Sequence, residues 1–337
     1  MSIPASATAE AGAGASAPAG LDLATGAGDA PGAPHRWQAA LRRFLRHPAG
    51  VTGLFLTLLV IVSGLLAEVI SPGDPFRTAG DPLLEPSGAH LFGTDNLGRD
   101  VFGAVLHGAR TSMIVVLGVS AIASVIGLAV GIVAGYRGGW IDDLLMRITE
   151  VFQSVPRFFL VLLIVALFGA GIDNLIYVLA LTSWPTLARV SRAEVLSVRD
   201  RDYVEAARSI GAADRRIILR HVLPNVLPTA LVVIALTGSR IILLEASLSF
   251  LGLGAPSVMS WGYLVSNAQR FLRVAWWMSV FPGLAIAISV LGINLMSDAL
   301  NDVLATYSQT APSGRPVGRL RRRLRRRPSA AVAPAAG

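Results

Sequence analysis

The stretch that decides the fold of this chain is residues 203–224, YVEAARSIGAADRRIILRHVLP. It is charged and rich in helix-forming residues, and it lies between two long apolar runs. It holds no obvious catalytic group. Its role therefore depends on the apolar segments that hold it at a membrane and on any protein surface that contacts it.

The apolar residues gather in runs that are close to the length needed to cross a bilayer. Of 337 residues, 53% are hydrophobic, and a helix needs roughly 20 apolar residues to span the hydrocarbon core. Six runs qualify, at about 51–70, 112–134, 157–170, 175–189, 226–250 and 279–297. The third is expected to begin near Asp142 as an amphipathic helix, and Pro156 should kink it. The sequence predicts an all-α polytopic membrane protein with six transmembrane helices.

All 29 basic residues are arginine, and the chain has no lysine and no cysteine. A P-loop needs a lysine to reach the terminal phosphates of ATP, so a standard P-loop is excluded. Without cysteine there is no disulfide or thiol chemistry to consider. If ATP drives the process in which this chain takes part, another subunit must bind it.

The distribution of arginine predicts the orientation in the membrane. The net charge of +8 could indicate nucleic-acid binding. However, 23 arginines lie in the two terminal tails, 135–157 and 189–222, whereas 71–110 and 251–277 hold five. Such asymmetry marks the cytoplasmic side, so both termini are expected in the cytoplasm and no nucleic-acid partner is expected.

The two ends of the chain differ from its centre. Residues 1–34 are mostly Ala, Gly, Pro and Ser, which predicts disorder. Residues 35–50 predict a basic amphipathic helix on the membrane surface, with docking to a partner as the alternative. A transmembrane domain follows over 51–300. Residues 301–337 form a basic tail that we expect to be largely disordered and to contact anionic lipid.

Residues 72–110 are predicted to form an outer loop that leads into the second span. Thr94 or Asp95 is a candidate N-cap of a short interfacial helix there. Asp95 and Asp100 could form an acid–base pair, but no third group supports this, and capping or loop-closing contacts are the preferred interpretation.

Glycines in the second span predict helix packing, and tryptophans near the sixth span predict contact with the membrane interface. Gly127, Gly131 and Gly135 are four residues apart, so they line one helix face and permit close approach of another helix. Three tryptophans favour a membrane-interface belt: Trp261, Trp276 and Trp277.

Residues 190–224 are expected to form a helical hairpin, the cytoplasmic loop between spans four and five. A helix is predicted from Val190 to Ile210, followed by a tight bend at Gly211. Asp214 starts a second short helix, and Leu223-Pro224 ends it. The apolar stripe of the hairpin is Val195, Val198, Tyr203, Ala206 and Ile210.

This hairpin resembles the EAA motif of binding-protein-dependent ABC importer permeases. That motif reads Glu-Ala-Ala, three residues, Gly, nine residues, Ile, any residue, Leu-Pro. Here Glu205-Ala206-Ala207 precedes Gly211 at that spacing, and Leu223-Pro224 follows at the expected distance. The position of the motif's Ile holds His221.

Further segments resemble the second permease subunit of the dipeptide/oligopeptide/nickel importers. They are FGTDNLGRD (92–100), GAR (108–110), GYRGGWIDD (135–143) and EASLSFLGLG (245–254). The resemblance covers about 40–305. Its end departs from the family, which has an Arg near 301 and Asp-Pro near 305–306, where this chain reads SDALNDVLATYS.

The resemblance implies a type I ABC importer permease of a bacterial cytoplasmic membrane. As a translocation subunit it would have no enzyme activity, metal site or cofactor of its own, and partner ATPase subunits would bind ATP and Mg²⁺. The resemblance also implies one homologous permease, two ABC ATPases and an extracytoplasmic solute-binding protein as partners. The ATPase-coupling residues would be Glu205, Ala206, Ala207, Gly211, Leu223 and Pro224. The implied solute is a di- or oligopeptide, with nickel or another small solute as the alternative.

Two ionisable residues in the fifth span have competing interpretations. Arg240 and Glu245 could line the solute pathway or could pair with other helices, and ionised groups at depth cost roughly 2.5–3.5 kcal/mol. They are also the candidates for an ion-coupled secondary transporter, which is the less favoured function together with a membrane scaffold that transports nothing.

Overall fold

The computed structural model describes residues 41–169 and 171–310. Within these ranges the chain is helical and no strand is present, apart from two isolated bridges in the outer loop. The predicted disordered tail at 1–34 lies outside the described residues, as does the end of the basic tail, 311–337. Of the expected amphipathic helix, residues 41–44 are helical, and Pro48 already begins the next helix.

The helices follow one another with short connections, except after α3 and α10. In chain order they are α2 (Pro48–Leu65), α3 (Ala67–Ile70), α4 (Val101–Arg137), α5 (Gly139–Ser154), α6 (Arg157–Phe168), α7 (Ile172–Arg199), α8 (Asp202–Ser209), α9 (Asp214–Ile217), a π-helical turn (Ile218–Val222), α10 (Leu223–Phe250), α11 (Trp261–Ala268), a 3-10 turn (Gln269–Phe271) and α12 (Trp277–Thr310). Residues 301–310, assigned above to the tail, continue α12.

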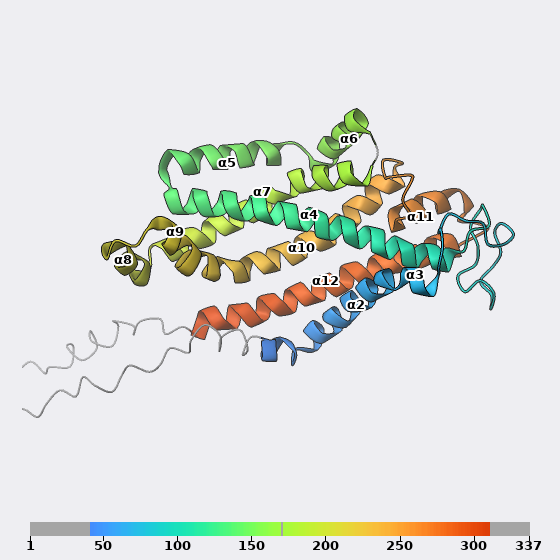
Figure 1. The fold of residues 1–337 in the computed structure, drawn as a ribbon, viewed down its shortest axis with the longest axis horizontal. Coiled ribbons are helices and arrows are strands. Elements are labelled where there is room, and N and C mark those ends of the chain that lie inside the picture. Colours follow the sequence, from blue (N-terminus) through green and yellow to red (C-terminus); the bar gives the residue numbers. More distant parts are fainter. Residues whose placement is uncertain (1–40, 170, 311–337) are drawn as a thin grey trace, which may run out of the picture. The chain divides into compact units, whose positions relative to one another are not determined.

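The long helices pack side by side within the described part (Figure 1). Helix α4 lies along α7, α2 lies along α12, and α10 contacts α4, α7 and α12. Figure 1 shows α8 and α9 at one end of this bundle and α11 with the outer loop at the other end.

Length and composition support fewer spans than six. Among the described residues, four helices are long and apolar enough to cross a membrane: α2, α4, the helix Asp214–Phe250 that includes α10, and α12. Helices α5 and α6 make a fifth if they count as one broken span, because they meet at 82°. The break at Pro156 confirms the expected kink. Helix α7 has 28 residues, but its composition is too polar to qualify.

The glycine face of α4 packs directly on α7, as the four-residue spacing predicted. A Cβ added at Gly131 would lie 2.5 Å from the Ala188 carbonyl oxygen, and one at Gly135 would lie 2.8 Å from Val195 Cβ. Side chains larger than hydrogen would force the two helices apart. This close contact fixes the C-terminal half of α4 against α7.

The outer end of α4 differs from the prediction. It is one continuous helix that begins at Val101, without a separate interfacial helix. Asp100 is its N-cap and accepts a hydrogen bond from the Gly103 N–H at 2.7 Å. Asp95 accepts from the Leu97 and Arg99 N–H groups, both at 2.8 Å. Both carboxylates therefore cap or close the loop, as preferred above, but the N-cap is neither Thr94 nor Asp95.

Two of the three tryptophans, Trp261 and Trp277, are buried inside the protein and stabilise contacts between segments. Trp261 and Trp277 are buried and donate their indole N–H to the Val105 and Thr94 carbonyls, at 3.0 and 3.1 Å. Trp276 is 53% exposed. The interface-belt interpretation was therefore wrong for Trp261 and Trp277, because the Trp261 indole joins α11 to α4 and the Trp277 indole joins α12 to the outer loop at Thr94.

Candidate functional site

The candidate site is the hairpin of residues 200–222, between α7 and α10. It begins where α7 ends, with Asp200 as its C-cap and Arg201 in an extended conformation. The Arg201 carbonyl then accepts from the Val204 and Glu205 N–H groups, which starts α8. The single helix predicted from Val190 to Ile210 is thus two helices with a break at 200–201. The reason is that α8 turns back onto the bundle to bury Val204.

Gly211 ends α8 with the geometry that the sequence predicted. Its φ is +78°, in the left-handed region, and a Cβ there would meet nothing within 4 Å. The Ala212 N–H bonds to the Ala207 carbonyl at 3.1 Å, and the Gly211 N–H bonds to the Arg208 carbonyl at 3.0 Å. These two bonds form a Schellman motif, which satisfies carbonyls that would otherwise be orphaned at the helix end.

The second half of the hairpin is continuous with helix α10. Helix α9 passes through the π-helical turn Ile218–Val222 directly into α10, so the expected end at Leu223-Pro224 was wrong. Pro224 cannot donate a backbone hydrogen bond and its ring crowds the preceding turn. The wider π turn makes room for it, with the Leu223 N–H bonded to the Ile218 carbonyl. The Asn225 side chain bonds the His221 carbonyl at 2.6 Å.

The inner face of the hairpin has its own hydrophobic core. Val204, Ile217 and Val222 are fully buried. They pack with buried residues from the inner ends of α4, α7 and α10, which are Ile132, Tyr136, Val195, Val198 and Val226. The hairpin is therefore tied by packing to the ends of α4, α7 and α10 that lie beside it.

Polar contacts tie the hairpin to the same helix ends. The Tyr136 hydroxyl, at the end of α4, donates to Asp214 of α9 at 2.8 Å. The Arg208 guanidinium lies over the Tyr136 ring, 5.7 Å from its centroid. Tyr136, as a hydrogen-bond partner, raises the pKa of Arg208. Arg199 donates to the Gly135 carbonyl at 2.8 Å and so holds the ends of α4 and α7 together.

The face of α8 that points away from the helix bundle is exposed. Glu205 and Ala206 are exposed, and so are Tyr203 at 41% and Ile210 at 85%. The expected apolar stripe therefore divides: Val195 and Val198 point inward, whereas Tyr203, Ala206 and Ile210 do not. An exposed tyrosine on α8 and an exposed isoleucine at its C-cap belong to a surface that another protein could cover.

The remaining motif residues lie on the inner side or at the start of α10. Ala207 and Leu223 are partly buried and pack against the hairpin core. Pro224 is exposed in the first turn of α10. The motif thus combines residues that hold the hairpin together with residues that present its outer face.

The structure does not bring Arg240 and Glu245 together. Glu245 is buried and accepts from the hydroxyls of Ser260 at 2.8 Å, Ser249 at 3.0 Å and Ser112 at 3.5 Å. Ser260 also caps α11 by accepting from the Tyr263 N–H. Arg240 is exposed on α10. Glu245 thus links α10, α4 and the outer helix α11.

Sequence reasoning missed the contacts of α5 and of Tyr136. Asp142, expected near the start of the third helix, lies in the first turn of α5 and forms a bidentate ion pair with Arg192 of α7, at 2.5 and 2.6 Å. Tyr136 lies in the segment 135–143, which the resemblance singled out, and Asp142 was expected only at the start of the third helix. No pattern in the sequence indicated that Asp142 pairs with Arg192 or that Tyr136 bonds to Asp214.

Two family models and one solved structure are similar to parts of this chain. Residues 127–306 match the family "Binding-protein-dependent transport system inner membrane component". Residues 35–86 match the family "N-terminal TM domain of oligopeptide transport permease C". A solved methionine ABC transporter in inward-facing conformations, MetNI, is similar with a TM-score of 0.49 and 19% identity, over 59% of this chain and 96% of that chain.

Curated relatives match along most of their length. A putative peptide transport system permease protein of Brucella abortus is 42% identical over 78% of this chain and 89% of that relative. A glutathione transport system permease protein of Pectobacterium atrosepticum is 38% identical, over 80% and 90%. A dipeptide transport system permease protein of Bacillus subtilis is 37% identical, over 79% and 84%. This chain is an integral membrane protein and belongs to the family of binding-protein-dependent transport system inner membrane components.

Proposed function

We propose that this chain is a permease subunit of an ATP-driven, binding-protein-dependent importer of di- or oligopeptides in a bacterial cytoplasmic membrane. Membership of the family is the observation that supports the permease role. The names of its relatives, which refer to peptides, dipeptides and glutathione, favour peptides over nickel. The chain provides the passage, and partner ATPases bind and hydrolyse ATP with Mg²⁺.

The exposure and packing of the hairpin support a mechanical role for it in transport. Its outer face is exposed, and its inner face shares a core with the inner ends of α4, α7 and α10. We propose that α8, with Glu205, Ala206 and Gly211, sits against an ATPase subunit. Closure of two ATPases would then push on α8 and swing the membrane helices between inward-open and outward-open states.

The complete complex would hold two homologous permeases, two ATPases and an extracytoplasmic solute-binding protein, in the manner of a type I importer. For this chain we propose six spans, with α7 crossing as the fourth and both termini in the cytoplasm. The close packing of α7 on the glycine face of α4 supports its place in the bundle. The polar residues of α7 would then face protein instead of lipid.

The first experiment measures peptide uptake by the reconstituted complex. Uptake should require ATP and should stop when the partner ATPases carry an inactivating substitution. It should continue when ion gradients are collapsed. Uptake that survives loss of ATP hydrolysis but stops without the ion gradient would establish a secondary transporter and would refute the proposal.

A second experiment tests the role of the hairpin. Glu205→Lys reverses a charge on the exposed face, and Gly211→Pro forces φ from +78° to about −65°. Both should abolish uptake and loosen ATPase association, while membrane insertion stays intact. Glu150→Lys is the matched control, because Glu150 is exposed on α5 outside the hairpin. Normal uptake in both hairpin variants would contradict this role.

A further inference from the structure

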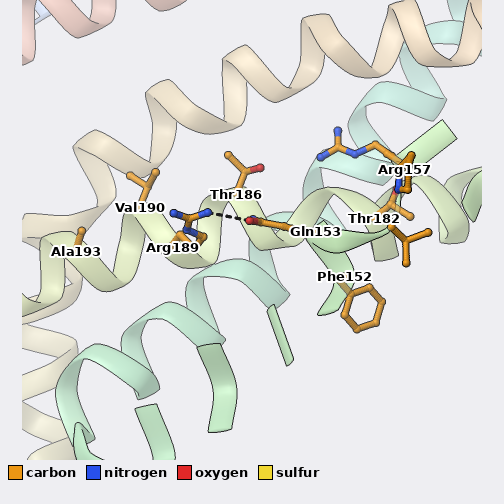
Figure 2. A pocket seen from close by; sticks show the side chains of 10 residues that line it. Phe152, Gln153, Arg157, Thr182, Thr186, Arg189, Val190 and Ala193 are labelled. Carbon is orange, nitrogen blue, oxygen red and sulfur yellow. Dashed lines mark hydrogen bonds between the residues drawn. The ribbon is translucent and has the colours of Figure 1, made fainter. Parts of the chain in front are cut away.

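A pocket of about 580 Å³ opens where α5 ends and α6 begins, against the middle of α7 (Figure 2). Its polar lining comes from Gln153, Arg157, Thr182, Thr186 and Arg189. No acidic side chain is among the described residues that line it. The volume lies in the range of small-molecule sites, roughly 300–1,000 Å³.

The pocket lies at membrane depth in the proposed topology. With a rise of 1.5 Å per helical residue, Thr182 and Arg189 are about 15 and 26 Å from the outer end of α7 at Ile172. The hydrocarbon core is about 30 Å thick. A cation at that depth is costly when it faces lipid. The two arginines are therefore expected to face protein or an aqueous path.

The positive charges around the pocket have no anionic partner within the described part of the chain. Arg157 is partly buried and lies close enough to Arg240 of α10 for the two charges to repel each other. Neither forms an ion pair with a described acidic side chain. Helix α6 also begins at Arg157, and no side chain caps its first N–H groups. The helix dipole adds further positive potential there.

The second arginine is already oriented. Arg189 donates from Nη1 to the Gln153 side-chain oxygen at 2.8 Å, which leaves its other N–H donors available. Figure 2 shows the side chains of Arg157 and Arg189 at opposite ends of the pocket, with Thr186 between them. Two cationic donors and a hydroxyl around one cavity are the chemistry that recognises an oxyanion.

We propose that this pocket binds the peptide solute in transit, with Arg157 as the donor to its terminal carboxylate and with Thr186 and Arg189, farther along the pocket, as donors to its carbonyl oxygens. The proposal rests on the proposed import of peptides, each of which carries a terminal carboxylate. The pocket would then be a transient binding site for the solute within the membrane, separate from the hairpin. Occupation by the carboxylate would neutralise the repulsion between Arg157 and Arg240.

The test is the number of peptides imported per ATP hydrolysed by the complete transporter in liposomes of neutral lipid. Arg157→Gln should lower this ratio about tenfold for a peptide with a free C-terminal carboxylate. It should leave the ATPase stimulation by the loaded binding protein unchanged. Arg157→Lys, which keeps the charge, should retain most of the ratio. Arg147→Gln is the control, since Arg147 is exposed on α5 and does not line the pocket.

A second solute separates the carboxylate from other occupants. The C-terminal amide of the same peptide, supplied at saturating concentration, should give equal ratios in wild type and Arg157→Gln. An equal loss for acid and amide, or a parallel loss of ATPase stimulation, would overturn the proposal. So would an effect that appears only with anionic lipid, because the occupant would then be a lipid phosphate. If the wild-type complex imports no peptide with ATP, the proposed function itself fails.

Discussion

Replacing Gly211 by alanine tests whether the left-handed turn holds α8 in place. A Cβ at this position would meet nothing within 4 Å, so the substitution adds no clash. The remaining cost is the left-handed backbone at φ +78°, about 1–2 kcal/mol for an alanine. That cost corresponds to a factor of about 5–30 in the equilibrium between ordered and frayed hairpin.

The assay is amide hydrogen exchange on the reconstituted complex. The reporters are the N–H groups of Ile210 and Ala212, which bond to the Ala206 and Ala207 carbonyls at 3.2 and 3.1 Å. Their exchange should accelerate at least about fivefold in Gly211→Ala. Gly211→Asn should have a smaller effect and Gly211→Val a larger one, since asparagine tolerates this backbone region and β-branched residues do not.

Gly73→Ala is the matched control, because Gly73 also has a positive φ, +106°, with nothing within 4 Å of its Cβ. It lies in the outer loop, so exchange in the hairpin should stay at the wild-type rate. Peptide uptake per ATP should follow the exchange data and fall in the order Asn, Ala, Val at position 211. Wild-type exchange in both Gly211→Ala and Gly211→Val would refute the reasoning.

Three further substitutions test the contacts around the site. Tyr136→Phe removes the hydroxyl that donates to Asp214; it should accelerate exchange in α9, with a loss of about 1.5 kcal/mol. Gly131→Ala places a Cβ 2.5 Å from a carbonyl oxygen of α7; it should lower the stability to thermal unfolding in detergent by about 1–3 kcal/mol. Glu245→Leu leaves three serine hydroxyls without their acceptor; it should accelerate exchange in α11 by loosening its N-cap.

Each of these substitutions has a control in the chain. Tyr203→Phe alters an exposed tyrosine and should leave exchange in α9 unchanged. Gly238→Ala should not destabilise, because its Cβ would lie 3.5 Å from the nearest atom, at ordinary contact distance. For Glu245→Leu the exchange of α9, at the other end of the bundle, serves as the reference. Wild-type behaviour of Tyr136→Phe or Gly131→Ala would show that the contact concerned carries no stability.

Local patterns in the sequence predicted what local physics controls. The turn at Gly211 follows from the one residue that enters the left-handed region without strain. The break at Pro156 follows from a missing N–H and a bulky ring. The spacing of Gly127, Gly131 and Gly135 places them on one helix face, and that face is where α7 packs. These features depend on residues close together in the chain.

Predictions failed where the local pattern competed with packing. Asp200 and Arg201 are compatible with a continuing helix, but the chain breaks there because Val204 is buried only if α8 turns back. Pro224 suggests a helix end, yet a π turn absorbs its ring and keeps the helix continuous. Trp261 and Trp277 are typical of a membrane-interface belt, but carbonyls of distant segments accept their indole N–H groups.

The sequence by itself determined that this chain is a helical membrane protein with a charged hairpin within residues 190–224 and a glycine turn at Gly211, because periodicity, glycine and proline act within a few residues. Only the tertiary structure decided how the hairpin is held. The Tyr136–Asp214 bond joins residues that are 78 positions apart, and the Arg192–Asp142 pair joins residues 50 apart. The pocket beside Arg157 likewise exists only where α5, α6 and α7 meet. Such pairings depend on which helices pack together, and no local pattern in one sequence encodes them.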